Sequence, residues 1–559
     1  MVNVKNLFGM AVMATALVGC SSNDNLAPDG KDNAGKAGEA YASFTINLPT
    51  TSGTRADEPG TPSFAEGTAA EYEVKNGTIL IFDASTDKFV TSAELGTMNP
   101  WTKKTDENGV TTAAIATVQL HNVTVGGNYK ALVLLNNNFD AATKKVTLPT
   151  TTDTYATWSA DASKVNAEKY ASTDGIFMAN APKYIDTESQ PTTLVPIANV
   201  CASREEAQAK AATTVYVERG LAKVTMQDFT AGGYSIDAGT YAGGNVKIMN
   251  WQLDVTNKST FPVHQTGTLK TSWGQIWNTP RFYDGTNTAF KRVYWGVDPN
   301  YNKSEYQTLE NCKTAFNMIT NDKVVGVAGQ DKPQYCLENT FDLDNMKQGQ
   351  TTRVVFKAVF TPKDFTSGET FYKIGNNTAI WSKTNLETQI HTVAVTVMGI
   401  TDPDEQDKYV VKLNASTNNI SGEAGLHTIK PENIEYTGTG TSLVDANIDK
   451  INEKLGLTET GISTYLNGEA YYIARIKHFN ELTPWNAGEA YDSNNEKYLG
   501  RYGVLRNNWY DLSVNSISGL GYPDVPEVKP NMPDDENEQY INVEVKILDW
   551  AKRSQSIDL

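Results

Sequence analysis

The sequence is poor in the residues from which catalytic and metal sites are commonly built. Its 559 residues include 4 cysteines and 5 histidines. The histidines are scattered along the chain: His121, His264, His391, His427 and His478. No two stand at metal-ligand spacing, and no HExxH, GxSxG or P-loop pattern is present. We therefore expect no enzyme, no cofactor and no bound metal.

Positive charge is also scarce. Lys and Arg total 48 against 65 Asp and Glu, which gives a net charge of −17 and a pI near 4.9. Nucleic acid needs a basic surface, so it is excluded as a partner. The first arginine is Arg55 and the next is Arg204. Arg55 therefore stands alone in the N-terminal part of the chain.

Long hydrophobic runs are absent except at the start. Residues 7–18 form a short apolar stretch behind Lys5, and its end overlaps Leu-Val-Gly-Cys at residues 17–20. A run this short is typical of a secretion signal rather than a membrane span. The ending matches the bacterial lipoprotein box, although an ordinary signal peptide with an incidental cysteine is the alternative. We predict a signal peptide at 1–19 and lipidation (palmitate) of Cys20, whose acyl chains would anchor the precursor stably to a membrane.

The three remaining cysteines cannot form a complete disulfide framework. They are widely spaced, at Cys201, Cys312 and Cys336, and none belongs to a CxxC pattern. One bridge plus a free thiol is an open alternative. Three buried thiols are the favoured interpretation.

A short alternating strand and a loop follow the leader. Phe44, Ile46 and Leu48 share one face of residues 41–48, whereas Ser43, Thr45 and Asn47 share the other. This period of two predicts a half-buried strand. Directly after it comes a polar loop rich in Gly, Pro and Thr that carries Arg55 and Ala56. Exposed loops of this kind are preferred sites of proteolysis, so we predict a cut between these two residues. Lys31 and Lys36 are further basic sites upstream.

The body of the chain reads as a succession of short strands. They are expected at 41–48, 77–85, 113–125, 129–137, 213–229, 246–255, 353–362, 392–400, 408–416, 470–479, 509–518 and 540–550. One helix is expected at 442–457, and residues 160–172 have helical character. The sequence thus predicts an all-β fold with minor helices, in which two β-sandwich domains span 56–230 and 231–522.

The C-terminal segment 523–559 combines a spacer with an amphipathic strand. Pro523, Pro526, Pro530 and Pro533 predict an extended, semi-stiff arm. The strand that follows carries alternating apolar residues and a tryptophan: Ile541, Val543, Val545, Ile547 and Trp550. One interpretation makes it the last strand of its own sandwich. The other makes it a donor strand that reaches a different molecule.

Tryptophans offer a competing hypothesis. Five of them could stack on sugars, which would suit a surface glycan-binding lipoprotein: Trp101, Trp158, Trp251, Trp295 and Trp381. In a β-sandwich, however, most tryptophans anchor the core. The acidic stretch 401–407 does not match a Ca²⁺ loop and is expected to be a solvated hairpin tip.

These features together resemble the type V pilins, the fimbrillins of Gram-negative anaerobes, most closely the major fimbrillins of short fimbriae. The acylated leader, the lone Arg-Ala, the β-sandwich pattern and the C-terminal strand all contribute. The stretches that carry the resemblance are 174–182, 215–226, 335–340, 500–523 and 540–559. The interdomain loops are longer than the family pattern, and the three downstream cysteines have no counterpart role.

The resemblance implies transthyretin-like sandwiches and a specific maturation route. The precursor, lipidated at Cys20, would be carried to the outer membrane and cut there after Arg55 by an arginine-specific surface protease. Cutting would release propeptide 20–55 with its strand 41–48, and the C-terminal strand of a neighbouring copy would fill the vacated groove. The implied role is a stalk subunit of a cell-surface fimbrium for adhesion, biofilm formation and virulence, with accessory anchor and tip subunits as partners. An anchor or tip subunit of the same fimbria is the related alternative.

Overall fold

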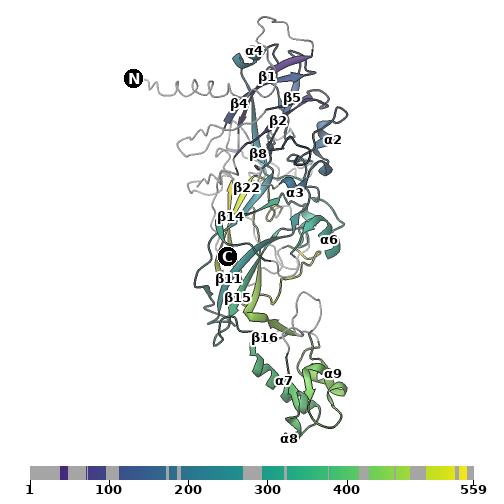
Figure 1. Cartoon of the computed structure of the whole chain (residues 1–559), viewed down its shortest axis with the longest axis vertical. Helices are drawn as coiled ribbons and strands as arrows, with labels where there is room; N and C mark the ends of the chain where they lie inside the picture. The colour runs from purple at the N-terminus through teal and green to yellow at the C-terminus, as the bar shows by residue number, and fades with distance from the viewer. Residues whose placement is uncertain are drawn as a thin grey trace, which may run out of the picture.

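A computed structural model of the chain describes residues 38–47, 71, 73–95, 113–170, 175–184, 190–267, 292–319, 324–375, 377–413, 427–458, 461–478, 499–534 and 541–549. The molecule is elongated (Figure 1). One β-sheet unit occupies the upper end of this view, a second lies in the middle, and a small lobe with helices α7 and α9 forms the lower end.

The first unit is an 8-stranded sheet with the order β3-β2-β5-β6-β8-β1-β4, in which β7 also pairs with β5. Its strands are β1 (Glu39–Asn47), β2 (Gly77–Asp83), β3 (Phe89–Glu94), β4 (Ala113–His121), β5 (Tyr129–Leu135), β6 (Met178–Asn180), β7 (Val195–Pro196) and β8 (Thr213–Arg219). The continuous apolar runs of β2 and β5 are explained by burial on both faces. Ile79 and Ile81 of β2 join one core cluster, and Leu80 and Phe82 join another.

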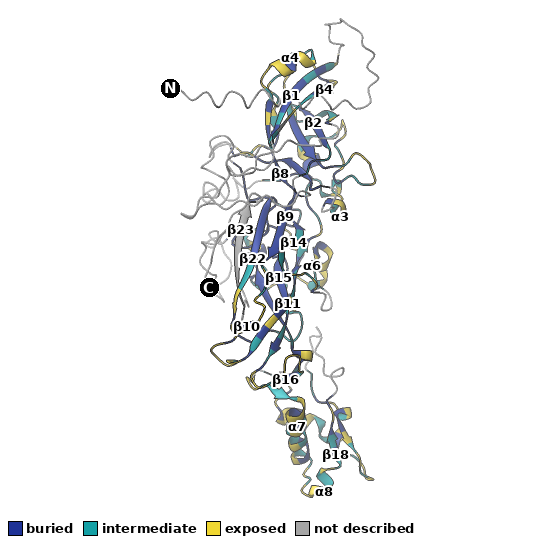
Figure 2. Cartoon of the chain, turned by 60° about the vertical axis from the view of Figure 1, so that its left-hand side comes forward, coloured by how far each residue is buried: buried dark blue, intermediate teal, exposed yellow. Residues whose placement is uncertain are grey.

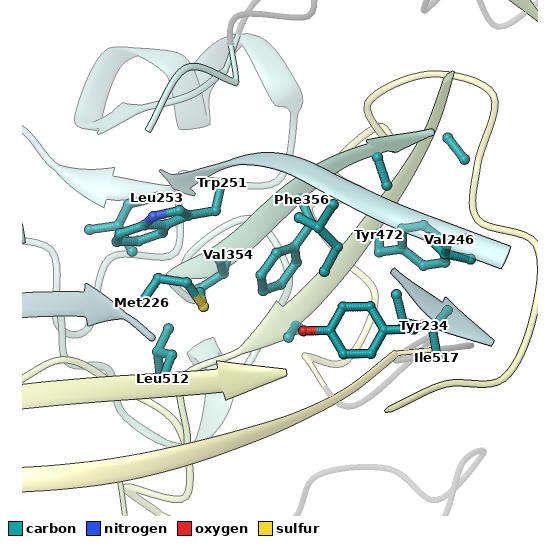
Figure 3. Close-up of a cluster of buried hydrophobic side chains, with 14 of the residues drawn as sticks. Met226, Tyr234, Val246, Trp251, Leu253, Val354, Phe356, Tyr472, Leu512 and Ile517 are labelled. Carbon is teal, nitrogen blue, oxygen red and sulfur yellow. The ribbon is translucent and has the colours of Figure 1, made fainter. Parts of the chain in front are cut away.

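The second unit is built from two four-stranded sheets, β10-β11-β15-β21 and β14-β9-β22-β23. Its strands are β9 (Leu221–Met226), β10 (Tyr234–Ser235), β11 (Asn245–Asp254), β14 (Gly329–Leu337), β15 (Arg353–Thr361), β21 (Glu469–Arg475), β22 (Asn508–Ile517) and β23 (Ile541–Asp549). Figure 3 shows Met226 and Leu512 facing Trp251, Val354 and Phe356 across their shared core. The predicted β-rich fold with minor helices is confirmed.

The chain crosses from the first unit to the second at Gly220. This residue separates β8 from β9, which lie in different sheets. A side chain here would meet the Tyr170 hydroxyl, because a Cβ on Gly220 would lie 2.3 Å from that oxygen. Residues 221–226 thus belong to the second unit, whereas the boundary was predicted after residue 230.

The lobe is an insertion between β15 and β21 with its own apolar cluster. Its elements are β16 (Phe371–Ile374), β17 (Trp381–Ser382), α7 (Lys383–Val397), α8 (Pro403–Gln406), β18 (Tyr409–Val411), η4 (Pro431–Asn433), β19 (Ile434–Tyr436), α9 (Val444–Lys454) and β20 (Ile462–Tyr465). The helix expected at 442–457 is confirmed as α9. The acidic stretch 401–407 carries α8 rather than a hairpin tip.

The strand expected at 392–400 is wrong, because α7 occupies most of it. Its β-branched residues suggested a strand, but the buried positions Leu386, Ile390 and Ala394 recur every four residues. Threonine is accommodated because its hydroxyl donates to the carbonyl one turn earlier, as Thr392 Oγ1 does to Thr388 O at 2.9 Å. Ser382 caps the helix by accepting the Asn385 N–H.

Short elements complete the described chain. They are α2 (Tyr155–Ser159), η2 (Ala162–Lys164), α3 (Ala167–Tyr170), α4 (Arg204–Ala209), β12 (Thr256–Asn257), α6 (Leu309–Ala315), β13 (Phe316–Asn317), η3 (Leu343–Asn345) and η5 (Leu466–Gly468). The helical character expected at 160–172 is confirmed by η2 and α3. None of the helices in the described part of the chain is long and apolar enough to cross a membrane.

Most of the described cysteines and tryptophans considered above are buried in the core. Cys201, Cys312 and Cys336 are free and buried, which confirms the favoured interpretation. Burial in Figure 2 follows the strands of both units. The fully buried side chains include Trp158, Trp251 and Trp295. Trp381 is half-buried, and Trp101 lies outside the described residues. Among the described residues, no group of His, Cys, Asp and Glu could hold a metal ion.

Candidate functional site in strands β1 and β23

The predicted removable strand, β1, lies inside a sheet rather than at its edge. It pairs antiparallel with β4 along its whole length, from Glu39 opposite His121 to Asn47 opposite Ala113. On its other side, Phe44 to Asn47 pair in parallel with β8. Loss of β1 would therefore leave two open edges. At a strand spacing of about 4.8 Å, the gap between β4 and β8 would be roughly 10 Å wide.

The apolar side chains of β1 are completely buried. Ala40, Ala42, Phe44 and Ile46 are each 0% exposed. They pack in one cluster with residues of the neighbouring strands, among them Val118, Leu120, Val215 and Val217. Phe44 and Ile46 lie on the face that the alternating pattern predicted. Leu48, which shares that pattern, lies outside the described residues.

The opposite face of β1 is more enclosed than the sequence predicted. Ser43 was expected on an exposed polar face, yet it is only 6% exposed. Its hydroxyl donates to Ala207 O of α4 at 2.8 Å and lies 2.8 Å from Thr117 Oγ1. Helix α4 begins at Arg204 because the Ser203 side chain caps it by accepting the Glu206 N–H. The prediction of a half-buried strand is therefore wrong at Ser43, where α4 covers the strand.

The N-terminal half of β1 has a second partner in place of β8. Tyr41 and Cys201 exchange two backbone hydrogen bonds, each 2.8 Å long. Cys201 is 0% exposed, and burial raises the pKa of its thiol. The guanidinium of Arg204 lies 5.7 Å from the centre of the Tyr41 ring. Both sides of β1 are thus occupied over much of its length.

The chain on the C-terminal side of Arg55 is fixed at Glu71. Its carboxylate, 1% exposed, lies 2.7 Å from Lys223 Nζ and accepts the Tyr335 hydroxyl at 2.6 Å. Burial lowers the pKa of Lys223, and the Glu71 charge opposes that effect. Because Lys223 and Tyr335 belong to β9 and β14, the second unit holds this point. Cys20, Arg55 and Ala56 lie outside the described residues.

The C-terminal strand β23 is the edge strand of its own chain's sheet. It pairs antiparallel with β22, from Asn508 opposite Asp549 to Ile517 opposite Ile541, with an irregularity between Val514 and Ser516. In this structure β23 is therefore the last strand of its own unit, which is the first of the two interpretations that the sequence allowed. The backbone positions of Ile541, Val543, Val545 and Ile547 lie in β23, whereas Trp550 lies outside the described residues.

The proline-rich segment before β23 is not a free arm. The expectation of an extended spacer is wrong for residues 523–534, which pack against the second unit. Val528 is buried in an apolar cluster, and Asp534 is 0% exposed. The prolines predicted a stiff, extended segment. The sequence pattern did not reveal that hydrogen-bond donors and acceptors elsewhere in the chain bind the backbone of this segment.

Comparison with known proteins finds a family match in the C-terminal region. Residues 463–556 match the family "Major fimbrial subunit protein type IV, Fimbrillin, C-terminal". This range includes β21, β22, the proline-rich segment and β23. The C-terminal region of the chain is thus similar to the fimbrillin family, which confirms the predicted resemblance. The narrower resemblance to the major fimbrillin of short fimbriae stays a prediction.

Solved structures resemble the chain only distantly. A protein from Parabacteroides distasonis ATCC 8503, provisionally assigned to cell adhesion, has 11% identity and a TM-score of 0.38 over 92% of this chain and 99% of its own. One from Bacteroides eggerthii DSM 20697, with the same provisional assignment, has 12% identity and a TM-score of 0.31 over 93% and 98%. A fimbrial assembly protein from P. distasonis ATCC 8503 has 13% identity and a TM-score of 0.25 over 58% and 98%. No curated protein matches the chain significantly.

Proposed function

We propose that the chain is a structural, non-enzymatic stalk subunit of a fimbrium that polymerises by strand exchange after a cut between Arg55 and Ala56. The observation that carries the proposal is the place of β1. It lies upstream of Arg55 in the sequence, yet it occupies an interior position of the first sheet. A cut after Arg55 would free this strand from the rest of the chain.

The vacated slot would bind a replacement strand strongly. Burial of side chains such as Phe44 and Ile46 contributes about 1.5–3 kcal/mol each, so an empty slot exposes a surface that favours refilling. Open strand edges favour it further, since their backbone groups lack partners. Strand β23 has the same length as β1, 9 residues, and an alternating apolar pattern. These two properties support β23 of a neighbouring copy as the replacement.

Strand exchange between these two places would give a filament. The slot lies in the first unit and β23 lies in the second, so the contact joins different surfaces of two copies. Such a heterologous contact continues from copy to copy and builds an open polymer. Until the cut, β1 blocks the slot. In this scheme, lipidated Cys20 holds the precursor at the outer membrane, an arginine-specific surface protease starts assembly, and anchor and tip subunits complete the fimbrium.

The glycan-binding alternative has lost support. It depended on tryptophans that could stack on sugars, but Trp158, Trp251 and Trp295 are fully buried. Their indole N–H groups donate within the protein, as Trp158 Nε1 does to Thr147 O at 2.7 Å. An anchor or tip subunit is a narrower alternative. A tip needs a slot but no donor, so the presence of β23 favours a stalk subunit.

The test is limited proteolysis of residues 21–559, which include every residue the structure describes. A limiting amount of an arginine-specific protease should produce a new N-terminus at Ala56 and SDS-resistant ladders of multimers. The Arg55→Ala variant, treated identically, should give neither. Wild-type protein that is cut at Ala56 but stays monomeric at high concentration would overturn the proposal. Filaments that retain residues 41–55 would overturn it as well.

A further inference from the structure

The segment before β23 is tied to the second unit by main-chain contacts at several points. Arg353, which is bound to Asp254, donates from Nη2 to Pro526 O at 2.6 Å. Gln348 N donates to Met532 O at 2.9 Å, and Lys347 and Pro533 form an antiparallel β-bridge. Gly349 leaves room for Pro530, since a Cβ on Gly349 would lie 2.9 Å from Pro530 Cα.

The last of these contacts is centred on Asp534. Its amide donates to Met346 O at 3.2 Å, and its carboxylate accepts the Thr351 hydroxyl at 3.0 Å. Its carbonyl accepts the Arg475 Nε–H. Asp534 and Thr351 are 0% exposed and Arg475 is 2% exposed. Releasing Asp534 would break these three hydrogen bonds inside the protein, which is costly because the groups that make them are buried.

We propose that Asp534 is the fixed end of the donor strand: when β23 exchanges between copies, residues up to Asp534 stay bound to their own second unit. This inference rests on the strand exchange proposed above and names the residue that limits it. Asp534 is a positioning residue, because it acts on the donor strand without entering the neighbour's slot. In contrast to Asp534, β23 is held in the sheet through one neighbouring strand, β22.

The fixed end sets the distance between two copies. Residues 535–540 connect Asp534 to Ile541, and a chain spans at most about 3.6 Å per residue. The first donor residue therefore lies within roughly 25 Å of its own Asp534. A free arm starting at residue 523 would reach more than twice as far. We infer that neighbouring subunits lie directly against each other, so that the filament is stiff.

Two engineered disulfides separate the fixed segment from the moving strand. Lys347→Cys with Pro533→Cys joins a bridge pair flanked by the Gln348 and Asp534 hydrogen bonds. Opposed Cα atoms in such a pair are about 4.5 Å apart, a separation that a disulfide tolerates. Ser513→Cys with Glu544→Cys joins β22 to β23 at opposed positions. Each variant, made on residues 21–559 so that Cys20 is absent, is its own control when reduced. Mass spectrometry verifies the bonds before an arginine-specific protease is added.

We expect the oxidised 347–533 variant to form ladders at a rate within about twofold of its reduced form, whereas oxidation of the 513–544 variant should suppress ladders at least tenfold. If the 347–533 variant formed ladders when reduced but not when oxidised, that result would overturn the proposal that Asp534 is the fixed end, and it would leave the strand-exchange proposal intact. Ladders that persist with the 513–544 bond formed, or wild-type protein that is cut but never polymerises, would overturn both proposals.

Hydrogen exchange gives a second readout that needs no substitution. In the precursor, the amides of Gln348 and Asp534 donate across the contact, to Met532 O and Met346 O. In purified wild-type filaments these two amides should keep the protection they have in the precursor. A loss of protection of tenfold or more in filaments would show that the segment detaches, which would overturn the proposal even if the disulfide variants failed to fold.

Discussion

Strands β1 and β23 have the same length but opposite positions in their sheets. Each has 9 residues, and each alternates apolar and polar residues in sequence. Strand β1 lies between β4 and β8, whereas β23 pairs, among the described strands, with β22 alone at the end of its sheet. An interior strand must break two hydrogen-bonded ladders to leave, and an edge strand must break one. In the proposed scheme, this difference explains why β1 needs a cut before it can leave and why β23 can exchange without one.

The covalent connection reinforces this difference. While β1 remains joined to the body, any transient departure is reversed by rebinding within the same molecule, at a high effective concentration. A cut between β1 and the fixed Glu71 would remove that advantage, because the released peptide diffuses away. Strand β23 stays connected to Asp534 throughout. In the proposed scheme the protease acts on the strand that cannot leave by itself, and the donor needs no cleavage.

The largest expected effect concerns the core side chains of β1. Phe44→Ala should lower the free energy of unfolding of the precursor by about 3–5 kcal/mol, because it empties a fully buried site in the first unit. Urea denaturation monitored by fluorescence measures the change. Thr45→Ala, at the neighbouring half-buried position, should cost less than about 1 kcal/mol. Equal effects of the two substitutions would contradict an interior position of β1.

The comparison also predicts different hydrogen exchange in the uncut protein. Amides of β1 should exchange only when the first unit unfolds, whereas those of β23 should exchange through local detachment from β22. We expect β23 amides to exchange about 100-fold faster, which corresponds to roughly 2.7 kcal/mol of opening free energy. Mass spectrometry of peptides covering 39–47 and 541–549 makes the measurement. Similar rates would mean that β23 is held as firmly as β1.

The sequence predicted the existence of strands β1 and β23 better than it predicted which strands pair with them. The alternation at 41–48 and 540–550 reveals two strands, because a period of two is a local property. It does not reveal that β1 lies between β4 and β8, since pairing depends on residues far away in the sequence. Ser43 illustrates the limit: it is polar, so it was placed on an exposed face, yet α4 supplies a carbonyl acceptor for its hydroxyl.

The same limit explains the two largest errors. The β-branched run at 392–400 favours a strand by composition, but tertiary packing on one helical face decides for α7. The prolines at 523–533 favour a free extended spacer, but Arg353, Gln348 and Thr351 bind this segment from the β14–β15 region. In both segments the local structure is decided by side chains and backbone groups that lie elsewhere in the chain.

The next prediction uses Cys201 as a natural reporter of β1. In the precursor it is 0% exposed, and its backbone pairs with Tyr41. In a chain of residues 21–540, which lacks a donor strand, proteolysis after Arg55 should raise the rate of Cys201 labelling by a maleimide at pH 8 about tenfold.

Cys312 and Cys336 are internal controls for this measurement. Burial raises the pKa of their thiols to about 11 and about 12, so few of their thiolates are present at pH 8. Their labelling should not change on cleavage. A uniform increase at all three cysteines would indicate general unfolding rather than the departure of β1.

The smallest expected effect tests how α4 holds β1. The hydroxyl of Ser43 donates to Ala207 O, one of the last carbonyls of α4, which lack partners within a helix. Ser43→Ala should therefore lower the free energy of unfolding by about 1–2 kcal/mol, the cost of leaving a buried acceptor unpaired. Thr214→Ala, an exposed change on β8 opposite Thr45, should cost less than about 0.5 kcal/mol. If Ser43→Ala costs no more than this control, α4 covers β1 without holding it, and the two ladders to β4 and β8 alone distinguish β1 from β23.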